Sequence, residues 1–240
     1  MIDWLKRVPT EPEIELQGET VPIVLRRLRS AKRLTLRLAP DGSEVRITLP
    51  GWANAREAIA FAHARTDWLA EQRAKIPMRE APAPGGDLMI RGDLVTLVWD
   101  EGARRRPVLG VGELRVGGPK QGLEGRLRRW LEREALGLFE VDAEHYCRTA
   151  QLDPVPVALS RAQKRWGSCS DRQRIRLNWR LVQAPDFVRR SVVAHEVAHL
   201  VHFDHSPAFH ALLDEIYEGD IRSADRWLKE NGRSLYTAFG

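Results

Sequence analysis

The pattern of apolar and polar residues changes about halfway along the chain. In the first half, short runs alternate with a period of two, as half-buried strands do. The clearest run is residues 32–49, where apolar residues alternate with polar ones on both sides of Asp41-Gly42, a tight-turn signal typical of a β-hairpin. Further strands are expected at 13–16, 21–28, 88–90, 94–99 and about 107–116, and one helix at 55–75 after a capping Asn54.

The second half has mainly helical periodicity. Apolar residues recur at spacings of three and four from 121 to about 150. Strands at 155–160 and 174–181, separated by a bend at 165–170, precede three more helices at 186–202, 206–216 and 222–231. We therefore expect an α+β protein with two parts: a β-rich N-terminal region with one helix (1–118) and a catalytic domain (119–240).

The motif His195-Glu-Val-Ala-His199 carries the chemistry. Residues four apart on a helix lie one turn apart on the same face, so the two imidazoles can share one divalent metal ion. Glu196 lies beside the first and is suited to take a proton from a metal-bound water. His205 can supply a third nitrogen, and three protein ligands plus water are typical of a catalytic zinc site. The sequence therefore predicts a metallohydrolase, with zinc first and other divalent metals as alternatives.

The residues around the motif favour a metal site over a chance surface helix. The helix from 186 to 202 is apolar nearly all round, which predicts burial, and buried polar side chains must be hydrogen-bonded or bound to metal. Glu215 or Glu218 on the following helix are alternatives for the third ligand. We favour His205 because it precedes a helix start at Ser206-Pro207, where a loop residue can turn inward.

Hydrolysis also needs a group that stabilises the developing oxyanion. The sequence leaves three candidates for transition-state or substrate contacts: Lys164, Arg165 and Tyr217. The strand over 174–180, or the strand near Ser160, can pair with an extended peptide by edge addition.

Composition sets the remaining expectations. The 240 residues carry a net charge of +5, and no apolar run is long enough to span a membrane. The start of the chain lacks the apolar stretch of a secretory signal, and two cysteines cannot form a disulfide framework, so we expect a cytoplasmic enzyme with no membrane partner. Arginine clusters at 26–29, 104–106 and 126–129 lie in different elements, so each one alone favours a solvated face.

Four segments between residues 161 and 209 resemble the YgjP-like metal-dependent hydrolases, zincins related to the WLM and SprT groups. They are Arg-Trp-Gly-Ser-Cys, Arg-Leu-Asn-Trp, the His-Glu-Val-Ala-His motif and Asp-His-Ser-x-x-Phe. The resemblance implies a zincin-like core: an antiparallel sheet, a backing helix, the metal-binding helix and a helix after the third ligand. It also implies that His195, His199 and His205 are the ligands and that Glu196 is the catalytic acid/base.

Three functions follow in order of preference. The first is a zinc metallopeptidase that acts on an extended polypeptide. The second is a metal-dependent nucleoside triphosphate pyrophosphatase or phosphohydrolase, since the same activated water can attack phosphorus and cations lie at Arg161, Lys164 and Arg165. The third is a DNA-associated, SprT-like protease. Polypeptide is thus the first expected partner, with nucleotide or nucleic acid as the alternatives.

Overall fold

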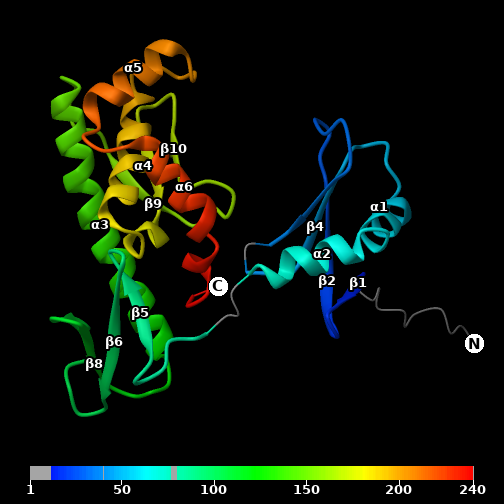
Figure 1. The fold of residues 1–240 in the computed structure, drawn as a ribbon, viewed down its shortest axis with the longest axis horizontal. Helices are drawn as coiled ribbons and strands as arrows, with labels where there is room; N and C mark the ends of the chain where they lie inside the picture. Colours follow the sequence, from blue (N-terminus) through cyan, green and yellow to red (C-terminus); the bar gives the residue numbers. More distant parts are fainter. Residues whose placement is uncertain (1–11, 40, 77–79, 240) are drawn as a thin grey trace, which may run out of the picture. The chain divides into compact units, whose positions relative to one another are not determined.

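The chain divides into two units, residues 1–78 and 79–240 (Figure 1). The computed structural model describes residues 12–39, 41–76 and 80–239. The division differs from the boundary expected at 118/119. The reason is packing: strands within 87–117 share one apolar core with the helices that follow them, so they belong to the second unit.

Unit 1 is built on a four-stranded sheet of order β1-β2-β4-β3. Its strands are β1 (Glu13–Leu16), β2 (Glu19–Arg27), β3 (Thr35–Leu38) and β4 (Val45–Leu49). β2 and β4 run parallel, and the other pairs are antiparallel. The hairpin expected over 32–49 is confirmed as the β3–β4 pair, in which Leu36 lies opposite Ile47.

Two helices, where one was expected, cover a single face of this sheet. α1 (Ala55–His63) and α2 (Thr66–Ala74) are separated at Arg65, whose φ of −119° and ψ of 22° leave the helical region. The break lets α1 pack on β2 and β4 while α2 packs on β1 and β3. Asn54 caps α1 as predicted, accepting a hydrogen bond from the Arg56 amide at 2.9 Å.

In unit 2, a second four-stranded sheet packs against a long helix. The sheet has the order β5-β6-β8-β7, with β5 (Asp87–Ile90), β6 (Asp93–Asp100), β7 (Val108–Leu109) and β8 (Glu113–Gly117). The helix α3 (Leu123–Thr149) begins directly after it. Leucines of α3 share one buried cluster with Leu97 and Leu114 of the sheet and with residues of the following helices.

A small mixed sheet leads into the candidate site. It contains β9 (Val157–Ser160), β10 (Gly167–Cys169) and β11 (Ile175–Asn178) in the order β10-β11-β9. β10 is antiparallel to β11, but β9 is parallel to it, so the expected fully antiparallel sheet is corrected to a mixed one. The segment expected as a bend at 165–170 includes an edge strand, and β11 ends early in a short 3₁₀ helix (Trp179–Val182).

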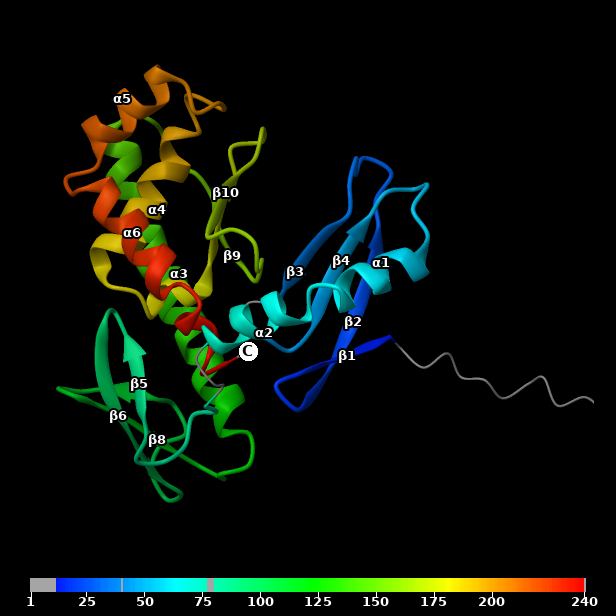
Figure 2. The same ribbon diagram turned by 45° about the vertical axis from the view of Figure 1, so that its right-hand side comes forward.

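Three further helices complete unit 2: α4 (Asp186–Ala198), α5 (Pro207–Ile216) and α6 (Ile221–Asn231). α4 lies along α3 on one side and α6 on the other, as both ribbon views show (Figures 1 and 2). The predicted α+β class is confirmed. In the described part of the chain, no helix is both long and apolar enough to cross a membrane.

A buried ion pair joins α4 to α3. Arg189 donates from Nε to Asp142 at 2.7 Å, and both side chains are almost fully buried. Arg189 also pairs with Asp186, which in turn pairs with Arg91 on the turn between β5 and β6. Pro185 occupies the N-cap position of α4, and Asp186 is the first helical residue. These contacts fix the start of α4 against its neighbours.

We predict that Arg189→Met lowers the free energy of unfolding by about 3–5 kcal/mol, because it leaves Asp142 buried without its hydrogen-bonded partner. Urea denaturation at pH 7 measures the change. The control is Arg148→Met, which removes an exposed ion pair with Glu144 four residues away and should cost less than about 1 kcal/mol. Equal effects of the two substitutions would contradict a structural role for the buried pair.

Candidate metal centre

Three histidine rings converge at the C-terminal end of α4. The Nε2 atoms of His195 and His199 are 3.2 Å apart, and Nε2 of His205 lies 3.3 Å from Nε2 of His195. His195 is the last-turn residue of α4, His199 is its C-cap, and His205 precedes α5. All three ligand atoms lie within 4.8 Å of one another. The structure therefore brings together the three residues predicted as ligands.

The arrangement fits a single tetrahedral metal ion. Zinc–nitrogen bonds of about 2.0–2.1 Å at tetrahedral angles place two ligand nitrogens about 3.4 Å apart. The observed separations of 3.2 and 3.3 Å agree with that spacing. Three imidazoles suit zinc, and also copper, iron or nickel, and they leave one position of a tetrahedron for water or substrate.

Neighbouring groups hold the rings in place. The Nδ1 of His199 lies 2.9 Å from the backbone carbonyl of His202, so it acts as the donor and leaves Nε2 free to bind metal. Phe209, fully buried on α5, packs against all three rings, with centroid distances of 5.0 Å to His195, 4.5 Å to His199 and 4.9 Å to His205. This supporting role of Phe209 was not deduced from the sequence.

Burial keeps the first histidine neutral. The pKa of His195 falls to about 4, first because the ring is desolvated and then because His199 and His205 repel a positive charge there. A neutral imidazole has a free lone pair, so this environment favours the form of histidine that binds metal.

Glu196 is buried, with only 5 % of its surface exposed to solvent. Burial raises its pKa to about 7, and this rise is opposed by the positive charge of Arg165 and by a hydrogen bond from the Cys169 amide. A carboxyl group with a pKa near neutrality is well matched to accepting and returning a proton.

Gly167 makes room for that carboxylate. A Cβ atom at residue 167 would lie 2.3 Å from Oε1 of Glu196 and 2.6 Å from its Cγ, well inside van der Waals contact. Any side chain at this position would displace Glu196 or push β10 away from α4. Residue 167 must be glycine because the site has no space for a Cβ atom, and the sequence alone does not reveal this requirement.

One edge of β10 is open. On its other edge, the Trp166 carbonyl accepts a hydrogen bond from the Asn178 amide at 2.7 Å. The Ser170 amide donates to the Arg174 carbonyl at 3.1 Å, so residues 166 and 170 face β11. Because backbone groups alternate along a strand, those of Gly167 and Cys169 face away from β11. The Cys169 amide binds Glu196, so the free edge next to the site presents the backbone of Gly167.

A pocket of about 250 Å³ adjoins Glu196 and His195. It lies between α4, α5, α6 and the start of β10. Its walls are mainly apolar, and its polar groups include Ser191, Asp225 and Arg165. The apolar residues are Trp166, Val192, Leu213, Ile221 and Leu228. This volume suits one amino-acid side chain better than a drug-sized ligand, which usually needs about 300 Å³ or more.

The three residues predicted to contact substrate or transition state have different positions. Arg165 lines the pocket and acts electrostatically on Glu196. Lys164 is exposed and does not line the pocket. Tyr217 is buried, and its hydroxyl donates to the Phe187 carbonyl at 2.8 Å. Phe187 is eight residues before His195 on α4, about 12 Å along the axis, so the structure does not bring Tyr217 to the histidines.

The alternative third ligands also lie outside the cluster. Glu218 pairs with Arg190 at 2.7 Å and accepts a hydrogen bond from Tyr146 at 2.9 Å. Glu215 is exposed, and neither glutamate belongs to the metal-ligating group found among the described residues. Of the candidates that the sequence left open, only His205 is brought to His195 and His199.

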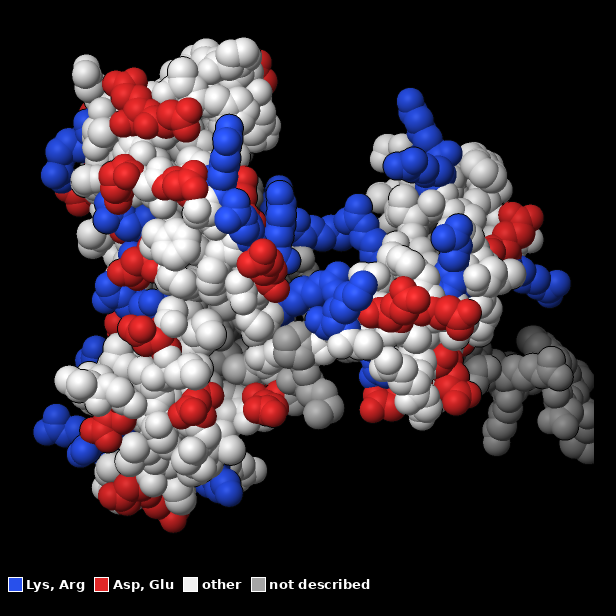
Figure 3. Space-filling model, in the orientation of Figure 1, with Lys and Arg blue, Asp and Glu red and all other residues white. Residues whose placement is uncertain are grey.

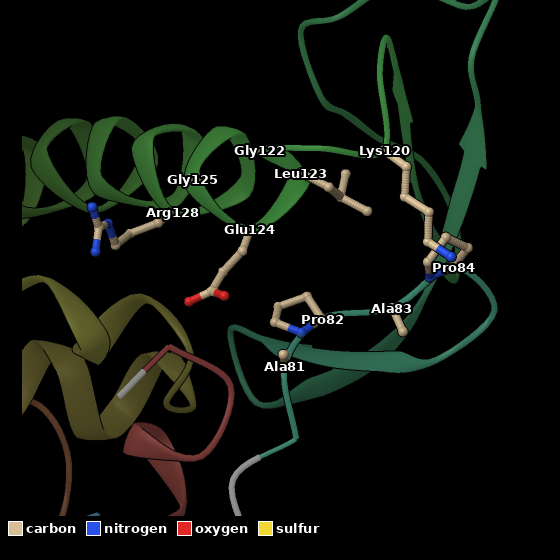
Figure 4. A pocket seen from close by; sticks show the side chains of 10 residues that line it. All are labelled: Ala81, Pro82, Ala83, Pro84, Lys120, Gly122, Leu123, Glu124, Gly125 and Arg128. Carbon is tan, nitrogen blue, oxygen red and sulfur yellow. The ribbon is translucent and has the colours of Figure 1, made fainter.

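A larger pocket, of about 530 Å³, lies at the N-terminal end of α3 (Figure 4). Its lining includes the prolines of the 81–84 segment and the charged residues Lys120, Glu124 and Arg128. None of its lining residues is a histidine, cysteine or serine. It therefore contains no cluster of histidine or cysteine ligands comparable with the three-histidine group.

Comparison with known proteins identifies the class to which this chain belongs. The sequence carries a metallopeptidase domain, which is a class of metal-dependent hydrolase. The matching family model is "YgjP-like, metallopeptidase domain" over residues 32–231, and the chain belongs to this family. The resemblance expected from the sequence is confirmed.

Among curated proteins, none matches the sequence. One solved structure that matches is the metallopeptidase zymogen of Pyrococcus abyssi abylysin. It is 21 % identical over 40 % of this chain and 96 % of that chain, with a TM-score of 0.36.

We predict that the protein binds one zinc-type ion per chain and that His205→Ala lowers the affinity strongly, because it removes one of three converging nitrogens. Glu215→Ala should leave the affinity unchanged. Elemental analysis after dialysis against a competing chelator measures both. Full retention of metal by His205→Ala, together with its loss from Glu215→Ala, would refute the three-histidine site.

We predict that Gly167→Ala keeps the metal but lowers hydrolytic turnover by about 10²-fold, since displacing a reacting group by about 1 Å has that effect. The matched control is Gly137→Ala in α3, where a Cβ meets nothing within 4 Å. Metal content, thermal unfolding and casein hydrolysis are measured for both. Wild-type turnover in a folded Gly167→Ala protein would show that Glu196 does not depend on this contact.

Proposed function

We propose that the protein is a zinc metallopeptidase that hydrolyses extended polypeptides, with Glu196 as the general base. The observation that carries the proposal is the combination of three converging imidazoles with a buried glutamate beside an open strand edge. All of these groups come from the region 119–240, expected from the sequence to be the catalytic domain. From the same arrangement of ligands we infer that a zincin-like core is formed by α3, the β9–β11 sheet, α4 and α5.

The residues have complementary chemical roles in this proposal. Zinc bound by His195, His199 and His205 would supply a Lewis acid that makes its water acidic near neutral pH. Glu196 accepts the proton of the attacking water and returns it to the leaving amine. The Cys169 amide donates a hydrogen bond to the carboxylate, and Arg165 supplies positive charge near it. Arg165 is therefore our candidate for stabilising the oxyanion.

The open edge of β10 supports an extended substrate. An unpaired edge binds a peptide by adding it to the sheet as another strand, using the substrate's own backbone groups. The backbone of Gly167 lies on that edge, next to Glu196. A substrate residue beside the scissile bond would then place its side chain in the 250 Å³ pocket, whose apolar walls favour apolar side chains.

The charges of the same pocket disfavour a nucleotide as substrate. A triphosphate site needs several cations or backbone amides around the phosphates. Among the residues that line this pocket, Arg165 is the single lysine or arginine, and Asp225 and Glu196 are acidic. These charges favour the peptidase over the nucleoside triphosphate hydrolase.

We predict that Glu196→Gln keeps its metal and fold but loses about 10²–10⁴-fold in turnover, because an amide cannot accept the water's proton. Casein hydrolysis, metal content and thermal unfolding are measured side by side. Near wild-type hydrolysis of a verified substrate by a metal-loaded Glu196→Gln protein would exclude Glu196 as the base.

A parallel assay decides the class of substrate. Purified protein is given unstructured casein and a panel of nucleoside triphosphates, with Glu196→Gln as the blank for both. We expect metal-dependent peptide cleavage and little release of phosphate or pyrophosphate. Nucleotide hydrolysis that is lost in both Glu196→Gln and Arg165→Ala, without peptide cleavage, would instead assign the site to phosphoanhydrides.

A further inference from the structure

The sheet of unit 1 has one covered face and one open face. Val21, Ile23, Val45 and Ile47 point to the covered face, where they form a buried cluster with residues of α1 and α2. Side chains alternate across a strand, so the residues between them lie on the other face. Neither helix of unit 1 packs there. We call this second surface the open face.

Cations gather on the open face without a structural reason. Arg37 of β3 lies directly opposite Arg46 of β4, and Arg46 is in register with Val24 of β2. Arg26 follows two residues later on β2, on the same face. Like charges directly opposite each other destabilise a sheet. Arg46 is paired with Glu44, but Arg26 and Arg37 are exposed and form no ion pair with any described residue.

The turn after β2 extends this charge. Arg29, Lys32 and Arg33 are exposed and, within the described ranges, have no ion-pair partner either. Among the acidic residues of the open face, Glu44 is paired with Arg46. Glu13 and Glu15 on β1 are in register with the start of β2, away from this turn. Figure 3 shows blue side chains at the end of unit 1 where the β2–β3 turn lies in Figure 1. We call this end of the open face, with Arg26, Arg37 and the turn, the cationic end.

An exposed tryptophan lies at the same end. Trp52 is 77 % exposed, in the loop between β4 and α1. Arg27, next to Arg26, fastens this loop by donating to the carbonyls of Pro50 at 3.3 Å, Gly51 at 2.7 Å and Ala53 at 2.8 Å. The backbone on both sides of Trp52 is therefore held in place, while its side chain stays exposed. A large exposed aromatic side chain on such a support is suited to binding a partner.

We propose that the cationic end binds single-stranded nucleic acid, with its guanidinium and ammonium groups on the phosphates and Trp52 stacked on a base. This pairing of a cationic track with an aromatic platform is how proteins bind single strands without sequence preference. A duplex is disfavoured, since its bases are not free to stack and both helices of unit 1 lie on the covered face. The proposal does not depend on the proposed peptidase activity.

The test uses the full-length protein and fluorescein-labelled 20-mers of deoxythymidine and uridine. Fluorescence anisotropy gives the affinity at salt concentrations from 50 to 200 mM. Each phosphate neutralised on a single strand contributes about −0.7 to the slope of log K against log salt. With the five unpaired cations engaged, we expect a slope of about −3.5. The two oligonucleotides compare binding to DNA with binding to RNA.

Variants identify the surface. Arg26→Ala with Arg37→Ala should weaken binding and make the slope shallower by about 1.4, that is, two phosphates. Trp52→Ala should weaken binding about tenfold or more, as removal of one stacking platform does, without changing the slope. Lys75→Ala, an exposed cation at the end of α2 on the covered side, is the matched control and should bind like wild type. Circular dichroism confirms that each variant is folded.

Several outcomes would overturn the proposal. One is the absence of binding to either 20-mer at 50 mM salt. Another is an equal effect of Lys75→Ala and the double arginine variant, which would indicate a general charge effect. Tighter binding to a duplex of equal length would reject the single-strand geometry. Binding to phosphatidylserine vesicles but to neither oligonucleotide would assign the surface to membranes.

Discussion

Four polar side chains gathered at one end of a largely apolar helix set the main constraint on unit 2. Three imidazoles and one carboxylate lie on or beside a helix whose other residues are mostly buried. Glu196 is buried, and His195 and His199 are half-buried, so their polar groups need partners. The Cys169 amide is the partner of Glu196, and the His202 carbonyl is the partner of His199. His205 is exposed and is positioned by its ring contact with Phe209. The surrounding elements are placed so that these partners exist.

The rotation and position of α4 follow from contacts at its other end. The buried pair of Arg189 with Asp142 holds α4 against α3, and Asp186 links the same region to the β5–β6 turn. A helix is stiff over its thirteen residues, so fixing Arg189 also fixes the direction in which His195 points, six residues later. An ion pair far from the chemistry thus contributes to the geometry of the site.

The sequence predicted the three converging histidines and Glu196 because their spacing on a helix is itself geometric information. It also predicted the β3–β4 hairpin from alternation. It did not predict the boundary between the units, because the sharing of one core by residues 87–117 and α3 is a long-range packing effect. Gly167 and Phe209 were missed for the same reason: their importance depends on what lies opposite them in space.

The hydrogen bond from the Cys169 amide to Glu196 makes the site depend on the backbone position of residue 169 and not on its side chain. The contact comes from the main chain, so residue 169 is constrained in backbone position but not in side-chain identity. Its thiol has a pKa raised to about 11, mainly by burial, and therefore stays protonated and unreactive at neutral pH. A substitution at residue 169 that leaves the backbone of β10 in place would therefore keep the contact between the strand and the carboxylate.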